Sequence, residues 1–145
     1  MPNRHTLLAV LLLAACRTAP TTNGASRAVN PASLATPDSV VDFLLTAAAT
    51  DFHAHRPPDP AGFRAVRLGR VIAASGAARY MLCGEFLPAA GGPNAEWVPF
   101  ATIRTSGYEQ WIGAQAVGYC QGSSITWSSV GDLSASLQRR LDSLR

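Results

Sequence analysis

The residue types best suited to chemistry in this chain are two histidines, a cysteine and a glutamate. His53 and His55 lie near Asp51 and Asp59, and such side chains could supply ligands to a metal ion. Residues two apart point to different sides of a helix and share a face only in an extended segment. No third ligand follows at the spacing of a metal site. We therefore expect solvent-exposed histidines at a helix end, with no metal and no cofactor.

Cys83 and Glu85 are the candidates for catalysis. A cysteine nucleophile needs a thiolate, a base and a group that orients the base, and the sequence around Cys83 has no such signature. Glu85 could act as a general acid only with a partner carboxylate or an altered proton affinity. The alternative is that Glu85 is exposed or paired with an arginine. The sequence predicts no enzymatic activity and no catalytic residue.

Aromatic side chains are concentrated in the C-terminal half of the chain. They are Trp97, Tyr108, Trp111, Tyr119 and Trp127. Tryptophan and tyrosine often anchor protein interfaces, so Trp97, Tyr108 and Trp111 form a candidate binding surface. The alternative is that the aromatic residues fill the core of a small domain.

Every basic residue other than histidine is an arginine, and the 12 arginines exceed the 9 acidic residues to give a net charge of +3. This mild excess does not indicate nucleic-acid binding, which requires a concentrated basic face. Four arginines could form a basic patch on a predicted hairpin, or a solvated strand face: Arg64, Arg67, Arg70 and Arg79.

The N-terminus has the layout of a secretory signal, with Arg4 and His5 before an apolar run that ends at Ala15. The run is shorter than the about 20 apolar residues of a membrane-spanning helix. Leu13-Ala14-Ala15-Cys16 resembles the lipobox of bacterial lipoproteins. This resemblance implies a signal peptide over 1–15 and a palmitate-bearing lipid anchor on Cys16. The alternative is an ordinary N-terminal helix.

The residue after the lipobox cysteine indicates which of the two bacterial membranes holds a lipoprotein. It is Arg17, and not the aspartate that retains lipoproteins of enteric bacteria in the inner membrane. We therefore expect the periplasmic face of the outer membrane. With Cys16 assigned to lipid, Cys83 and Cys120 remain, and an oxidising periplasm favours a disulfide between them. Two buried free thiols are the alternative.

The first elements follow from composition and periodicity. Residues 16–36 are mostly small and polar and predict a flexible tether before a single periplasmic domain over 37–145. Thr36-Pro37-Asp38 favours a helix start, and apolar residues at helical spacing predict a helix over 37–54.

Three strands are predicted next, at 63–72, 79–87 and 96–104, with a hairpin turn at Ser75-Gly76 and a loop over 89–95. The first strand would carry Val66, Leu68 and Ile72 on one face, and a bulge near Arg64 would repair its alternation. Pro99 indicates an edge position or a bulge in the third strand.

Residues 105–121 are interrupted by glycines, and we expect a loop followed by a strand that reaches Cys120. Asp132 can cap a last helix. The leucines of that helix form one stripe: Leu133, Leu137, Leu141 and Leu144. The order predicts an α+β domain with an N-terminal helix, an antiparallel sheet of three or four strands and a C-terminal helix.

Three short motifs together resemble those of small bacterial envelope proteins of uncharacterised function. They are Phe63-Arg64-Ala65-Val66-Arg67, Cys83-Gly84-Glu85 and Trp97-Val98-Pro99-Phe100. An Asp59-Pro60 link precedes the first of these motifs. The chain departs from that pattern at Phe86-Leu87-Pro88, which stands where asparagines are usual. The resemblance implies the architecture and no known reaction.

The segment from Ser75 to Tyr80 resembles the S-G-x-R-Y segment of membrane-bound inhibitors of C-type lysozyme, with one extra alanine. The tryptophan and lysine-glycine segment of those inhibitors is absent. Our leading hypothesis is a lipid-anchored envelope protein with a non-catalytic binding or structural role. Its partner would be an envelope protein or the cell wall. Inhibition of a lysozyme-type hydrolase is the alternative.

Overall fold

The computed structural model describes residues 38–55 and 59–145. The predicted signal peptide, Cys16, the tether and the helix start at Thr36-Pro37 lie outside the described residues. No helix in the described ranges is both long and apolar enough to cross a membrane.

The described chain forms three α-helices, a five-stranded sheet and a short 3-10 helix. The N-terminal half comprises α1 (Asp38–His55), β1 (Pro60–Ile72), β2 (Ala78–Pro88) and the 3-10 helix η2 (Ala89–Asn94). The C-terminal half comprises β3 (Val98–Arg104), β4 (Tyr108–Ile112), α2 (Ala114–Cys120), β5 (Thr126–Trp127) and α3 (Ser134–Asp142). The strands pair antiparallel in the order β4-β3-β2-β1-β5. This arrangement confirms the predicted α+β class, with a strand count above the expected three or four.

The elements α1 and β2 form where the apolar pattern predicted them. One side of α1 is buried along its length, including Leu44, Ala48 and Phe52, because these residues recur at helical spacing. The side chains of β2 alternate between the two faces of the sheet. Leu82 and Phe86 enter one core while Met81 and Cys83 enter the other.

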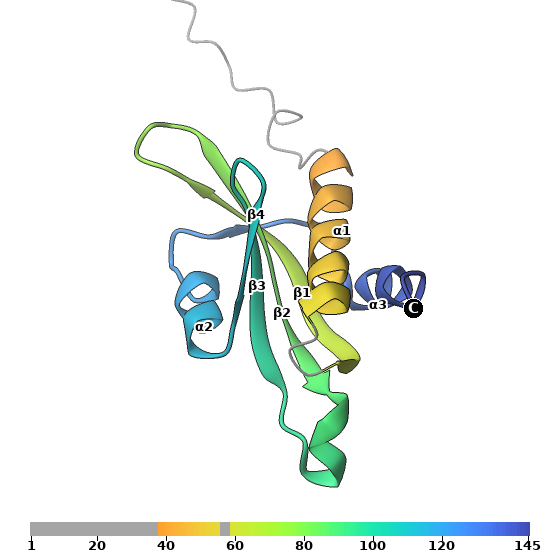
Figure 1. The fold of residues 1–145 in the computed structure, drawn as a ribbon. Helices are drawn as coiled ribbons and strands as arrows, with labels where there is room; N and C mark the ends of the chain where they lie inside the picture. The colour runs from red at the N-terminus through yellow and green to blue at the C-terminus, as the bar shows by residue number, and fades with distance from the viewer. Residues whose placement is uncertain (1–37, 56–58) are drawn as a thin grey trace, which may run out of the picture. The chain divides into compact units, whose positions relative to one another are not determined.

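The sheet therefore has two covered faces with different partners. The helix-covered face packs against α1 and α3, on the side opposite α2 (Figure 1). Phe52 lies at its centre, with the rings of Phe86 and Phe100 at centroid distances of 5.0 and 5.3 Å in edge-to-face geometry. The second face is covered in part by α2, whose Ala116 is fully buried against Ala101 and Ile103.

The glycine-rich segment after β3 differs from the prediction. Its residues form strand β4 and then helix α2, so Cys120 ends a helix and not a strand. Gly113 at the start of α2 has φ 68°, a conformation that glycine adopts without steric cost, and the chain turns out of the sheet there. Residues 89–95, expected as a loop, include η2.

Pro99 lies in an inner strand and not at an edge or a bulge. The carbonyl of Pro99 accepts the N–H of Gly113, and the β3–β4 pairing begins one residue later at Phe100 and Ile112. The Pro99 nitrogen points to the same side of β3 as the Pro99 carbonyl. On that side β4 has already ended at Ile112, and Gly113 begins the turn into α2. No ladder hydrogen bond is therefore lost.

Two apolar residues are less buried than their positions predicted. Ile72 at the end of β1 is 55% exposed, and Leu144 beyond α3 is 41% exposed. Leu137 and Leu141 are fully buried against the helix-covered face, so α3 docks through its middle.

Candidate functional site

A β-bulge in β1 sets which side chains reach the second face of the sheet. Arg64 pairs with Glu85 and Arg67 pairs with Cys83, so Ala65 and Val66 together oppose Gly84 alone. Ala65 has φ 51° at this irregularity. Residues three apart would lie on opposite faces of a regular strand. The extra residue instead places Arg64 and Arg67 on the second face, and the structure confirms the predicted bulge.

Gly84 of the Cys-Gly-Glu motif is required by this bulge. A Cβ added at Gly84 would lie 2.8 Å from Cγ2 of Val66 and 2.9 Å from Cε1 of Phe100. Such distances are shorter than van der Waals contact, so a side chain here would displace the helix-covered core. The glycine lets the bulged backbone of β1 close onto β2.

A disulfide holds α2 over the second face. The structure joins Cys83 on β2 to Cys120 at the end of α2, with a Cα–Cα distance of 5.9 Å. The bond confirms the predicted pairing, although Cys120 reaches it from a helix. Cys83 is therefore not a free thiol here, and the alternative of two buried thiols does not hold in this structure.

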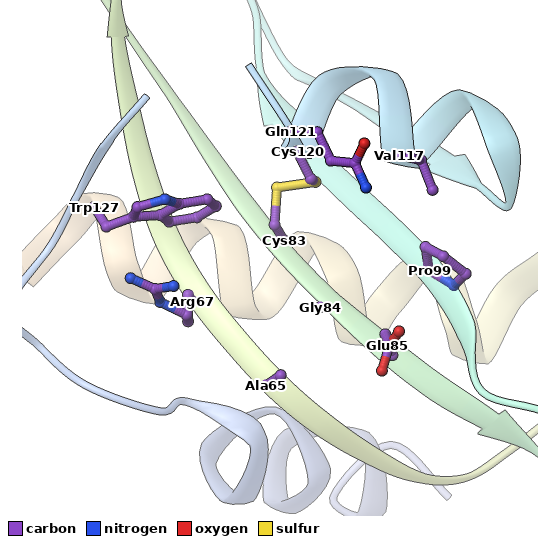
Figure 2. Close-up of a pocket in the computed structure, with 10 residues that line it drawn as sticks. All are labelled: Ala65, Arg67, Cys83, Gly84, Glu85, Pro99, Val117, Cys120, Gln121 and Trp127. Carbon is purple, nitrogen blue, oxygen red and sulfur yellow. A yellow bond between two sulfur atoms is a disulfide. The ribbon is translucent and has the colours of Figure 1, made fainter. Parts of the chain in front are cut away.

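A groove lies beside this disulfide, between α2 and Trp127 (Figure 2). Its volume is about 330 Å³. Side chains from β1, β2 and β3 form its floor, α2 with the residue after it forms one wall, and Trp127 forms the other. The lining residues are Ala65, Arg67, Cys83, Gly84, Glu85, Pro99, Val117, Cys120, Gln121 and Trp127.

Arg67 and Trp127 form one end of the groove. The guanidinium carbon of Arg67 lies 4.5 Å from the ring centroid of Trp127, a cation–π arrangement visible in Figure 2. Gly69 makes this possible, because it pairs with Trp127 across the β1–β5 ladder and a Cβ there would lie 3.1 Å from the indole ring. Arg67 is exposed and forms no ion pair with any residue in the described ranges.

Glu85 lines the groove away from Trp127 and is already paired. Nε of Arg64 donates to Oε2 of Glu85 at 2.5 Å, and the Arg64 guanidinium lies 4.4 Å from the Trp97 ring centroid. The alternative in which Glu85 is paired with an arginine is the arrangement found. Among the residues that line the groove, Glu85 is the only carboxylate.

The three residues of the candidate binding surface are not brought together. Trp97 packs on Arg64. Tyr108 lies on the helix-covered face and donates from its hydroxyl to Oδ1 of Asp51 at 3.3 Å. Burial raises the pKa of Tyr108, as does the adjacent Asp51 carboxylate. Trp111 lies on the second face, where its ring centroid is 5.7 Å from that of Tyr119.

The histidine segment ends α1 and holds no metal-type cluster. His55 Nδ1 lies 3.1 Å from Oδ1 of Asp51, four residues earlier on the helix. Asp59 pairs with Arg145. Among residues 38–55 and 59–145, no three histidine, cysteine, aspartate or glutamate side chains are grouped to hold an ion.

The predicted arginine patch is divided by the strand alternation. Arg70 pairs with Tyr80, which packs against the helix-covered core, whereas Arg64 and Arg67 lie on the second face. The segment that resembles lysozyme inhibitors forms the β1–β2 turn and the start of β2, and none of its residues lines the groove. Inhibition of a lysozyme-type hydrolase stays a prediction, to be tested by a turbidity assay.

Sequence reasoning missed the pairing of Arg67 with Trp127. The two residues are 60 positions apart, and only the bulge and the β1–β5 ladder bring them together. The alternation of apolar and basic residues in Phe63-Arg64-Ala65-Val66-Arg67 could have indicated the site. With a bulge in this segment, both arginines fall on the same face of the strand.

Comparison of the chain with protein-family models, with curated proteins and with solved structures found no match. The site must therefore be interpreted from its own geometry.

Proposed function

We propose that this chain is a lipid-anchored protein of the bacterial envelope, held at the periplasmic face of the outer membrane through Cys16. Its folded domain is a non-catalytic binding module that uses the groove beside Arg67 and Trp127. The observation that carries this proposal is the open groove itself, which has an exposed cation held over an aromatic ring at one end.

Two features support the compartment. The Leu-Ala-Ala-Cys segment ends an apolar run of the length found in secretory signals. Disulfides persist mainly in oxidising compartments, so the cross-link between Cys83 and Cys120 is consistent with an exported domain.

The anchor is tested by replacing its cysteine. We expect Cys16→Ala to abolish incorporation of labelled palmitate and to leave an unprocessed precursor. Equal labelling of the variant and the wild type would contradict the anchor, while leaving the groove unaffected.

Binding is tested in intact envelopes with a photo-crosslinking residue at Gln121, which lines the groove. We expect an adduct that disappears when Arg67→Gln is added. The matched control is the same crosslinker at Glu109, an exposed position on β4 that does not line the groove. Equal adducts from both positions, or none from Gln121, would contradict the proposed binding role.

A further inference from the structure

We propose that the groove binds a carboxylate carried by a short peptide segment, and that Arg67 pairs with that carboxylate. This inference rests on the proposed binding function and names its ligand class. It is carried by the position of Arg67, the charge balance of the groove and the apolar character of its remaining lining.

Arg67 is arranged to receive an anion. Its guanidinium has no carboxylate partner among the described residues, yet the ring of Trp127 holds it in place at 4.5 Å. A planar guanidinium can donate two parallel hydrogen bonds to one carboxylate. Because the ring already restricts the side chain, less conformational entropy is lost when a ligand binds.

The charges within the groove direct an anion to this end. The only acidic side chain among the lining residues is Glu85, and Arg64 neutralises it through a 2.5 Å hydrogen bond. Arg67 is thus the uncompensated charge of the site. Figure 2 shows Glu85 well separated from the Arg67–Trp127 pair, so a carboxylate at Arg67 would not contact it directly.

The remaining lining suits a short peptide. Ala65, Pro99, Val117 and the disulfide offer apolar contacts for small side chains. The Gln121 amide can donate to and accept from a peptide backbone. A volume of about 330 Å³ is at the small end of ligand pockets, which limits the occupant to a short segment.

The test uses the full chain in detergent and the indole N–H signals of its three tryptophans. The probe is acetyl-Ala-Glu-Ala-amide, and its neutral match is acetyl-Ala-Gln-Ala-amide. We expect the acidic peptide to shift the Trp127 signal saturably and the neutral peptide to bind about tenfold or more weaker, as the loss of a charged hydrogen-bond partner predicts. The Trp111 signal serves as an internal control, because Trp111 does not line the groove.

A second pair of peptides identifies the source of the carboxylate. Acetyl-Ala-Ala-Ala with a free terminal carboxylate is compared with its amide. Tighter binding than that of acetyl-Ala-Glu-Ala-amide would assign the groove to chain termini, and weaker binding would assign it to acidic side chains.

Variants connect the signal to Arg67. We expect Arg67→Gln to abolish the difference between acidic and neutral peptides and Arg67→Lys to reduce it, because lysine lacks the paired donors. Arg79→Gln, the same charge change at an exposed position on β2 outside the groove, should leave binding unchanged.

Equal binding of acidic and neutral peptides would overturn the ligand class, as would the absence of a saturable shift with either carboxylate peptide. If the Arg67→Gln variant still binds the acidic peptide more tightly than the neutral one by the wild-type margin, the role of Arg67 is wrong. If the Gln121 adduct forms in envelopes while the peptides do not discriminate, the binding function stands and only the ligand class is wrong.

Discussion

The backbone of Val66 is hydrogen-bonded to Ser134 across the edge of the sheet. The Val66 N–H donates to Oγ of Ser134 at 3.2 Å, and the Val66 carbonyl accepts the N–H of Leu133 at 2.8 Å. The bulge in β1 is therefore tied to the segment that begins α3. The same bulge places Arg64 and Arg67 on the groove side, so the docking of α3 and the geometry of the groove depend on one backbone irregularity.

The first prediction concerns Ala65, whose φ of 51° is unfavourable for a residue with a Cβ. We expect Ala65→Val to lower the free energy of unfolding by about 1–3 kcal/mol, since a β-branched side chain is more strained in this conformation. Ala65→Gly should retain wild-type stability, because relief of strain offsets the greater freedom of the unfolded chain. Urea denaturation measures both, with Ala78→Val at an exposed strand position as the control. An unaltered midpoint for Ala65→Val would show that the bulge adapts without strain.

The second prediction concerns Gly84. We expect Gly84→Ala to cost about 1–3 kcal/mol of stability, because the added methyl group would press on the Val66 backbone and the Phe100 ring. Gly62→Ala on β1 is the matched control, since a Cβ there meets nothing within 4 Å. Its effect should stay within about 0.5 kcal/mol. Similar urea midpoints for the two variants would contradict the close approach of β1 to β2.

The third prediction concerns the disulfide, which joins residues 37 apart. Loss of the bond in a Cys83→Ala, Cys120→Ala double variant should lower stability by about 4 kcal/mol in the chain-entropy estimate. The measurement is the urea midpoint with and without reductant. Reductant should lower the midpoint of the wild type and leave that of the double variant unchanged. Two reactive thiols at Cys83 and Cys120 in the denatured, unreduced protein would contradict the bond.

The fourth prediction concerns Asp132 and acid stability. Hydrogen bonds donated by the Ser134 hydroxyl and backbone N–H to the Asp132 carboxylate lower the pKa of Asp132. A carboxyl group whose pKa is lower in the folded state stabilises the fold above its unfolded pKa, and that contribution is lost as the pH falls through the folded value. We expect Asp132→Asn to be less stable than the wild type at neutral pH, with the difference shrinking below about pH 4.

The measurement is a series of urea midpoints from pH 7 to pH 2. Glu109→Gln, which removes an exposed carboxylate on β4, controls for the general loss of surface charge. A difference between Asp132→Asn and the wild type that stays constant over this range would refute the link between Asp132 and acid stability.

The elements whose apolar period is long and uninterrupted can be predicted from the amino-acid sequence. The residues of α1 repeat at helical spacing over 18 residues, and β2 alternates cleanly between two buried faces. The pairing of Cys83 with Cys120 follows by elimination once Cys16 is assigned to lipid. The bulge is predictable because Phe63 and Val66 are both apolar but, being three residues apart, would lie on opposite faces of a regular strand.

The conformation of the segment from Tyr108 to Trp127 and the location of the groove depend on contacts between residues far apart in the chain. In this segment glycines interrupt every local pattern, so burial against β3 and the disulfide select strand β4 and helix α2 over other conformations. The Arg67–Trp127 pair depends on the register of β1 with β5 and on the absence of a side chain at Gly69, which leaves room for the indole ring. Both features involve residues far apart in the chain. Local periodicity carries no information on such contacts, because they form only when the whole sheet assembles.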